Sequence, residues 1–288
     1  MIFTVVGGDM RSARLAELLA AEGNECRVFA LDKLNVDTAV TSCSDIRSAA
    51  ENTDCVILPL PVSLKEGFLN APLSDTAHLL PGIFAALPKS AVVCGGRVDE
   101  KTAEAVKAAG LTIEDYSERE EFTVANAAAT AEGALQILME ELPVTIAGTK
   151  CLVVGFGRIG KLLAIKLSVL GADVTVSARS CGDMAWIRAL GLKAADTRRL
   201  KGTLGDYSVI VNTVPARILD RETLHGVNRE CLCLDLASKP GGIDLNAAAD
   251  LKLKTIWALG LPGETAPAAS GAAMNEAVKN ILRERGRL

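Results

Sequence analysis

Aromatic residues are scarce in this sequence, and long apolar runs are missing from it. Phe, Trp and Tyr make up 3% of the 288 residues. No apolar run approaches the ~18 residues of a membrane span, and the first residues pass from a strand-like run straight into a glycine turn, so we expect a cytoplasmic protein without a membrane segment. The net charge is −4 with both signs mixed along the chain. The absence of a basic stripe argues against nucleic-acid binding.

Metal-binding patterns are missing as well. The eight cysteines are scattered, and only Cys231 and Cys233 approach each other, as C-x-C. Because metal sites need other spacings, we expect no metal and mostly buried, free thiols in a reducing compartment. Histidine occurs only as His78 and His225.

The chain is rich in Ala, Val, Leu and Ile, and 49% of it is apolar. Such residues suit buried parallel strands covered by helices of small residues. A length of 288 residues is near that of two domains at roughly 150 residues each. The composition therefore favours an α/β protein with two cores.

Strand-like and helix-like segments alternate along the whole chain. In the first half, the strand-like runs are 2–6, 27–30, 55–61, 91–96 and 111–116, with helical patterns at 11–22 and 99–109 between them. In the second half, the strand-like runs are 150–155, 173–178, 207–214, 231–237 and 254–260, with helices at 158–170 and 183–190. This alternation predicts two doubly wound α/β domains, the first of them flavodoxin-like or half of a Rossmann fold.

The segment between the two halves predicts one long helix at 117–141, with Gly133 as the place for a kink and Pro143 as its end. A last helix at 271–285 is expected to cross back to the first domain, leaving a cleft between domains. We therefore expect a substrate domain of residues 1–117 plus about 268–288, a connecting helix of residues 118–142, and a second domain of residues 143–267.

A glycine-rich turn opens the second domain. Gly155, Gly157 and Gly160 are spaced as G-x-G-x-x-G, and they follow a strand and begin a helix. In this context the first glycine permits the turn, the second lets the pyrophosphate of a dinucleotide approach the helix N-terminus, and the third permits close packing. The loop, with Phe156, Arg158 and Ile159 between the glycines, predicts a Rossmann NAD(P)-binding domain.

Cofactor preference is expected at the end of the next strand. An Asp or Glu there would bind the ribose hydroxyl of NAD, but this sequence has Ser177, Arg179 and Ser180. These side chains could bind a 2′-phosphate by charge-assisted hydrogen bonds, which favours NADP(H) over NAD(H). In the alternative, Arg179 is a solvated turn residue and either cofactor is accepted.

Later strand ends should converge on the same crevice, beyond the carboxyl ends of the strands. We expect the nicotinamide to lie among them. The cofactor-binding candidates at these ends are Thr213, Val214, Pro215, Asp235 and Ala237.

Cationic side chains beside glycines are the candidates for holding an acidic substrate. Arg97 follows Gly95 and Gly96 and is the best carboxylate clamp. Arg11 is a second clamp, and Lys239 is a clamp or proton donor near the nicotinamide. Asn126, Thr130 and Glu132 on the long helix are expected to orient the substrate. Each of these residues has a plain structural alternative, as a solvated or turn residue.

The loop after the last strand, Gly260 to Gly263, contains no histidine. A 2-hydroxy acid dehydrogenase of this layout needs an acid/base there, so the loop argues for hydride transfer at a C–N or C–C bond instead.

Several motifs together resemble the family of dipicolinate synthase A chains. They are Gly7-Gly8-Asp9 with Arg11, the segment from Glu118 through Asn126 to Ala134, Met139 to Pro143, Gly155 to Lys161, Asp235 to Gly242, and Ala258 to Gly263. The family usually has Ala and Gln where this chain has Met10 and Ser12.

The resemblance implies NADP-dependent oxidation of a dihydrodipicolinate, formed from 4-hydroxy-tetrahydrodipicolinate by loss of water, to dipicolinate during sporulation. It also implies a small dicarboxylate substrate and a flavoprotein-like partner, the B chain of dipicolinate synthase. A homo-oligomer is a further arrangement left open. Two alternatives remain: another dehydrogenase of this layout, of the shikimate or amino-acid type, and a non-catalytic NADP-binding protein.

Overall fold

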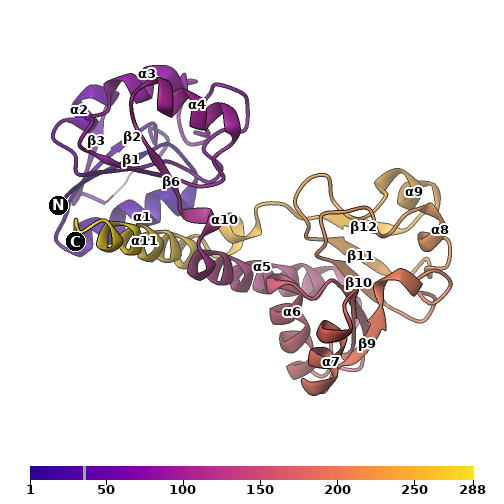
Figure 1. Cartoon of the computed structure of the whole chain (residues 1–288). Coiled ribbons are helices and arrows are strands. Elements are labelled where there is room, and N and C mark those ends of the chain that lie inside the picture. Colours follow the sequence, from indigo (N-terminus) through magenta and orange to yellow (C-terminus); the bar gives the residue numbers. More distant parts are fainter. Residues whose placement is uncertain (35–36) are drawn as a thin grey trace. The chain divides into compact units, whose positions relative to one another are not determined.

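The structure, a computed structural model, describes residues 1–34 and 37–288. The chain forms two compact units (Figure 1), one of Met1–Asn126 with Ala266–Leu288 and one of Ala127–Thr265. The division falls within the helix α5, Glu120–Glu141. Each unit contains one six-stranded sheet, and every strand pair in it is parallel.

The first sheet contains β1 Ile2–Val6, β2 Glu25–Phe29, β3 Val40–Cys43, β4 Cys55–Ile57, β5 Val92–Gly95 and β6 Ile113–Asp115, in the order β3-β2-β1-β4-β5-β6. This is the full strand order of a dinucleotide-binding sheet. The flavodoxin-like and half-Rossmann alternatives are therefore wrong. β3 was not predicted, because it is a short edge strand whose middle residues are polar and exposed.

The helices of the first unit are α1 Met10–Ala21, α2 Ile46–Ala50, α3 Leu80–Ala86, α4 Glu100–Ala108, the short 3₁₀ helix η1 Tyr116–Glu118 and α11 Pro267–Glu284. The C-terminal helix α11 lies beside α1 (Figure 1). Gly271 permits this contact, since a Cβ there would lie 2.9 Å from the carbonyl oxygen of Arg11.

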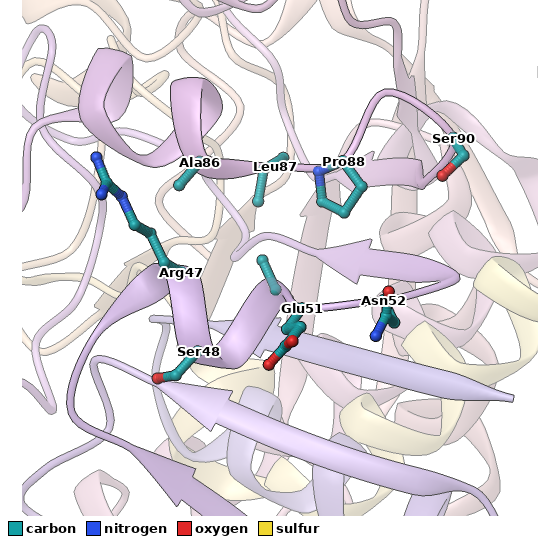
Figure 2. A pocket seen from close by; sticks show the side chains of 9 residues that line it. Arg47, Ser48, Glu51, Asn52, Ala86, Leu87, Pro88 and Ser90 are labelled. Carbon is teal, nitrogen blue, oxygen red and sulfur yellow. The ribbon is translucent and has the colours of Figure 1, made fainter.

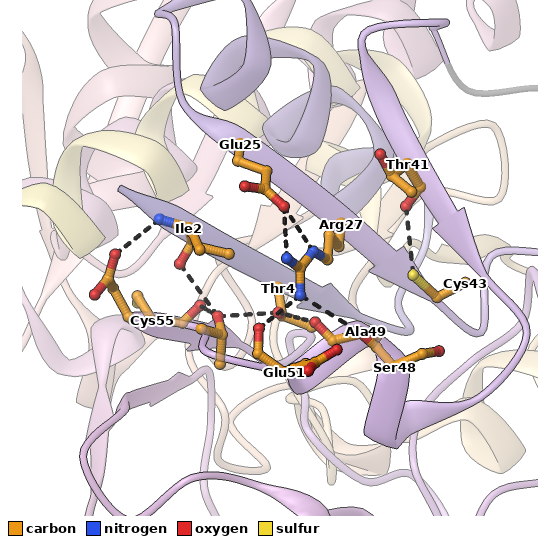
Figure 3. A network of polar contacts seen from close by, with 12 residues as sticks. Ile2, Thr4, Glu25, Arg27, Thr41, Cys43, Ser48, Ala49, Glu51 and Cys55 are labelled. Atoms are coloured by element: carbon orange, nitrogen blue, oxygen red, sulfur yellow. Dashed lines mark hydrogen bonds and ion pairs between the residues drawn. The ribbon is translucent and has the colours of Figure 1, made fainter.

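A polar network fixes α2 against the first sheet (Figure 3). The buried Thr4 hydroxyl donates to the carbonyl of Ala49 at 2.7 Å. The Arg27 guanidinium donates to the Glu25 carboxylate at 2.6 Å and to the carbonyl of Glu51 at 2.6 Å. These bonds satisfy backbone carbonyls at the end of a five-residue helix.

The second sheet contains β7 Lys150–Val154, β8 Asp173–Ala178, β9 Lys193–Asp196, β10 Val209–Asn212, β11 Leu232–Asp235 and β12 Lys254–Trp257, in the order β12-β11-β10-β7-β8-β9. Counted from its own first strand, this is the same order as in the first sheet. β9 was not among the predicted runs, since its sequence, Lys-Ala-Ala-Asp, is short and only half-buried.

The helices of the second unit are α6 Arg158–Val169, α7 Cys181–Ala189, α8 Arg221–Leu224, α9 Leu245–Asp250 and α10 Leu261–Thr265, with the 3₁₀ helix η2 Thr197–Arg199 after β9. The buried residues Ala131, Ala134 and Leu138 of α5 belong to the core of this unit. Gly133 lies inside the continuous helix α5, where the absence of a side chain lets Leu261 and Thr265 of α10 approach. No helix in the described ranges is long and apolar enough to cross a membrane.

Candidate functional site

The glycine loop after β7 has the geometry that a pyrophosphate needs. Gly155 has a φ of +104°, and a Cβ there would lie 2.5 Å from the Thr213 hydroxyl. At Gly160, a Cβ would lie 2.2 Å from the carbonyl oxygen of Gly155, so only glycine lets α6 pack on the turn. By contrast, no heavy atom lies within 4 Å of the Cβ position of Gly157. The space over the second glycine is therefore open, as close approach of a ligand requires.

The N-terminus of α6 is also open. Its N-cap, Gly157, has no side chain to accept hydrogen bonds from the first turn, whereas Ser180 caps α7, Asp220 caps α8 and Asp244 caps α9. The uncapped N–H groups and the positive end of the helix dipole favour an anion. Around them, Phe156 is buried, Ile159 is half-buried and Arg158 is exposed at the first helical position.

The end of β8 holds one of the three predicted 2′-phosphate ligands differently. Ser177 is fully buried, and its hydroxyl accepts a hydrogen bond from Thr197 at 3.1 Å. Its side chain therefore faces the neighbouring strand end and not the surface, which corrects its assignment to the cofactor. Ser180 is exposed and caps α7 by accepting from the N–H of Asp183 at 3.0 Å.

Arg179 is the residue at this edge that stays available. Its side chain is exposed, and it makes no hydrogen bond or ion pair with the part of the chain that the structure describes. The sequence reasoning missed the carboxylate of Asp196, which lies opposite Ala178 on the adjacent β9. Arg198 donates to Asp196 at 2.9 Å and lowers the pKa of that carboxyl to about 2. Because this carboxylate is already neutralised, it leaves the edge cationic.

The ends of β10 and β11 are joined through Asp235. Its buried carboxylate accepts from the Asn212 side chain at 2.7 Å and from the N–H groups of Ala237, Gly242 and Ile243 at 3.0, 2.8 and 3.0 Å. With its oxygens used in this way, Asp235 holds the loop from Leu236 to Ile243 and does not contact a cofactor. This corrects its assignment.

The neighbouring candidates differ in how open they are. The Thr213 hydroxyl donates to the carbonyl of Val154 at 2.9 Å, Val214 is half-buried and Pro215 is exposed. Ala237 is buried, and its carbonyl accepts from the Trp257 indole at 2.9 Å. Lys239 is exposed in the loop that Asp235 holds.

In the first unit, Arg11 is already paired. Its guanidinium donates to both carboxylate oxygens of Asp9, at 2.9 and 2.7 Å, and to the carbonyl of Leu60 at 2.7 Å, and its side chain is only 11% exposed. A guanidinium whose charge is compensated by a bidentate carboxylate is a poor clamp for a second anion. The assignment of Arg11 as a substrate clamp is therefore corrected.

Arg97, by contrast, is exposed at the carboxyl end of β5, and its guanidinium has no hydrogen-bond or ion-pair partner among residues 1–34 and 37–288. Beside it, Gly96 lies against Tyr116, since a Cβ there would be 2.7 Å from the ring. Tyr116 is fully buried and donates to the carbonyl of Leu58 at 3.1 Å. Burial raises the pKa of this phenol well above its usual value, so it remains a neutral donor.

The three candidates on α5 do not form one polar face. Glu132 is exposed and pairs with Lys166 of α6 at 2.8 Å, while Thr130 is buried and Asn126 is half-buried. Glu132 is therefore directed along α6, two turns from its N-terminus. This corrects the expectation that the three side chains orient a substrate together.

Two hollows lie at the opposite, amino edges of the sheets. One, of about 460 Å³, is lined by Arg47, Glu51, Pro88 and neighbouring residues that precede β4 and β5 (Figure 2). The other, of about 770 Å³, is lined by residues 139 and 142–147 with Leu170, before β7 and β8. Because ligands of such sheets bind beyond the carboxyl ends of the strands, neither hollow is the candidate site.

The thiols do not offer a reactive centre at these edges. Six of the eight cysteines are buried, Cys43 is half-buried and Cys181 is exposed. Burial raises the pKa of Cys26 and of Cys151 to about 12, so both remain protonated at neutral pH. Within the described ranges, no group of three or more His, Cys, Asp or Glu side chains could hold a metal ion.

Comparison with known proteins was made with this geometry in hand. Residues 2–117 match the family described as the N-terminal domain of the dipicolinate synthase A chain. The chain is 29% identical to the dipicolinate synthase A chain of Bacillus subtilis (strain 168) over 282 residues, which cover 97% of this chain and 95% of that protein.

Solved structures agree with the sequence matches. The crystal structure of the dipicolinate synthase A chain from Bacillus halodurans has a TM-score of 0.89 at 26% identity, covering 98% of this chain and 97% of that one. A transhydrogenase from Sinorhizobium meliloti, at 15% identity, has a TM-score of 0.73 and covers 99% of this chain and 94% of its own, which shows a shared fold. The resemblance that the motifs predict is thereby confirmed: along its full length, this chain is a relative of the dipicolinate synthase A chains.

Proposed function

We propose that this chain is the oxidoreductase component of a dipicolinate synthase, which oxidises a dihydrodipicolinate to dipicolinate with NADP⁺ as hydride acceptor. The observation that carries the proposal is the full-length similarity to dipicolinate synthase A chains, combined with an open, uncapped glycine turn at α6.

The reaction asks little acid-base chemistry of the protein. A hydride leaves one ring carbon of the dihydropyridine for the nicotinamide, and a proton leaves a neighbouring ring position for solvent or a protein group. The products are the aromatic ring, the reduced cofactor and one proton. Because aromatisation lowers the energy of the product, the residues mainly have to orient the substrate and bind its carboxylates.

The cofactor would be held by the second unit. The N–H groups of Gly157 and of the first turn of α6 would bind the pyrophosphate. Arg179 would bind a 2′-phosphate, which supports NADP(H) over NAD(H), because no uncompensated carboxylate of the described chain faces that strand end. Thr213, Val214 and Pro215 would border the nicotinamide half.

The substrate carboxylates would be bound by Arg97 and Lys239, the two exposed cations of the candidate set. Arg97 offers a planar guanidinium that suits bidentate binding, and Lys239 offers a single charge. The relatives are named as one lettered component of a synthase, which supports a partner, the B chain, in the working enzyme.

The decisive experiment supplies hydroxytetrahydrodipicolinate and NADP⁺ to the purified chain, alone and with the B chain, and follows dipicolinate and NADPH formation. We expect NADPH and dipicolinate in equal amounts. No product under either condition contradicts the proposal. Tight NADPH binding without any absorbance change at the nicotinamide band would instead indicate a non-catalytic role.

The cation assignment has its own test. Replacing Arg97 or Lys239 by Ala should abolish turnover while leaving the dissociation constant for NADPH within about 2-fold, because neither residue touches the glycine turn. Variants that retain wild-type turnover would show that both side chains are merely solvated.

A further inference from the structure

Arg97 has a backbone conformation that side chains other than glycine rarely adopt. Its φ is +53°, in the left-handed region. For a residue with a Cβ this conformation is costly, and such residues persist where the surroundings hold them. Gly95 and Gly96 stand directly before it, so the strained position is occupied by arginine although the turn is already rich in glycine.

Asp115, at the end of the adjacent strand β6, holds this turn. Its carboxylate accepts from the N–H of Arg97 at 3.1 Å and from the N–H of Val98 at 2.8 Å. The Ser117 hydroxyl accepts from the same Arg97 N–H at 2.8 Å and donates to Asp115 at 2.6 Å. All of these bonds reach the backbone, so the guanidinium of Arg97 remains unengaged by them.

The arrangement differs from that of the nearby Arg11, whose guanidinium is itself bound by a carboxylate. At Arg97 the carboxylate fixes the peptide and leaves the charge exposed. Two successive N–H groups bound to one carboxylate define the direction of the residue between them.

We propose that Asp115 is a positioning residue, which holds Arg97 in the left-handed conformation so that its guanidinium projects from the carboxyl edge of the first sheet to bind a substrate carboxylate. Ser117 supports it by bonding to both. This inference rests on the proposed function, since it concerns the binding of the same dicarboxylate.

A double-mutant cycle with Arg97→Ala and Asp115→Asn tests the proposal. The readouts are the dissociation constant for dipicolinate, by titration calorimetry, and the separate kcat and KM values. We expect Asp115→Asn to weaken dicarboxylate binding about 10-fold and to leave the KM for NADP⁺ unchanged. In the Arg97→Ala background the same substitution should have no further effect on dicarboxylate binding, because the two residues act as one unit.

Strain supplies a second, ligand-independent readout. Asp115→Ala should lower Tm in the wild-type background and lower it much less with Arg97→Gly, because glycine needs no support in this conformation. Lys252→Gly is the matched control, since Lys252 is an exposed cation with φ +58° outside the site. Asp45→Asn is the control for a carboxylate that accepts from two backbone N–H groups. Neither control should change dicarboxylate binding.

The outcomes separate this inference from the proposed function. A wild-type chain that neither turns over nor binds the dicarboxylate contradicts the proposed function, and with it the ligand assigned to Arg97. An active wild type in which the effects of Asp115→Asn and Arg97→Ala add, or in which Asp115→Asn weakens NADPH and dicarboxylate binding alike, overturns the positioning role alone.

Discussion

The two sheets share one strand order, but the turn after the first strand is closed in one unit and open in the other. In the first unit, Asp9 caps α1 and accepts from the N–H of Arg11 at 3.0 Å, and a Cβ at Gly8 would lie 2.0 Å from the Ser12 hydroxyl. In the second, Gly157 leaves the first turn of α6 without a cap.

This difference shows how one topology supports two uses. The carboxylate of Asp9 lies where a helix N-terminus would otherwise attract an anion, and Arg11 balances its charge. At α6 that anion has to come from a ligand. The same fold therefore provides a dinucleotide site only where the chain omits its own carboxylate.

The largest effect is expected from placing the carboxylate of the first unit into the second. Gly157→Asp should weaken NADP(H) binding at least ~100-fold, because the new carboxylate occupies the pyrophosphate position and repels it. Stability should hold or rise by about 1 kcal/mol, since Asp is a good N-cap. Titration calorimetry with NADPH and thermal unfolding measure the two effects.

Gly82→Asp provides the control for this substitution, because Gly82 also lies in the first turn of a helix and has no atom within 4 Å of its Cβ position. Unchanged NADPH affinity in Gly157→Asp would break the comparison between the two turns.

The converse substitution opens the first unit. Asp9→Ala removes the cap of α1 and leaves the nearly buried Arg11 without its carboxylate, so we expect a loss of about 2–3 kcal/mol in the free energy of unfolding. Inorganic phosphate should then raise the Tm of the variant more than that of the wild type, because α1 has become an anion site. Urea unfolding with and without phosphate checks this, and equal phosphate effects in both proteins would contradict it.

A smaller effect concerns the choice between cofactors. Arg179→Ala should weaken NADPH binding about 10-fold, through loss of charge-assisted hydrogen bonds to the 2′-phosphate, and change NADH binding by less than about 2-fold. Arg188→Ala, at an exposed arginine in the last turn of α7, is the matched control. If NADH binds the wild type at least as tightly as NADPH, the preference for NADP(H) is wrong.

The smallest effect is a pH dependence at the same edge. Arg198 lowers the pKa of Asp196 from 3.8 to about 2 in the folded chain. A lowered folded-state pKa means that this carboxylate stabilises the fold above about pH 4 and ceases to do so as the pH falls towards 2. NMR titration of the Asp196 carboxyl should show the low pKa, and Arg198→Ala should return it towards 3.8. An unshifted value in the wild type would mean that the ion pair is absent.

The sequence was informative where function depends on local chemistry. The roles of Gly155, Gly157 and Gly160 follow from a spacing within six residues, and so could be predicted. The edge strands β3 and β9 could not, because short half-polar strands lack the apolar pattern that marks buried ones.

Site residues that depend on distant partners were harder to predict. Asp235 stands at a strand end, as a ligand would, but its partners come from a loop that folds back onto it. Asp115 contacts Arg97 only because β5 and β6 pair. The pairing of Asp9 with Arg11 was detectable, since an Asp directly before a helix is a cap signal.

The contact between α11 and α1 has a consequence for how the protein is made. Asn275 of α11 donates to Glu22 at the end of α1 at 2.9 Å, although the two residues are 253 positions apart. Gly271 packs against the backbone of Arg11, beside the carboxyl edge of the first sheet. During synthesis the N-terminal sheet must therefore wait, with one helix uncovered, until the whole second unit and the last segment have left the ribosome. An incomplete chain could fold its dinucleotide-binding unit but not finish the one that begins it.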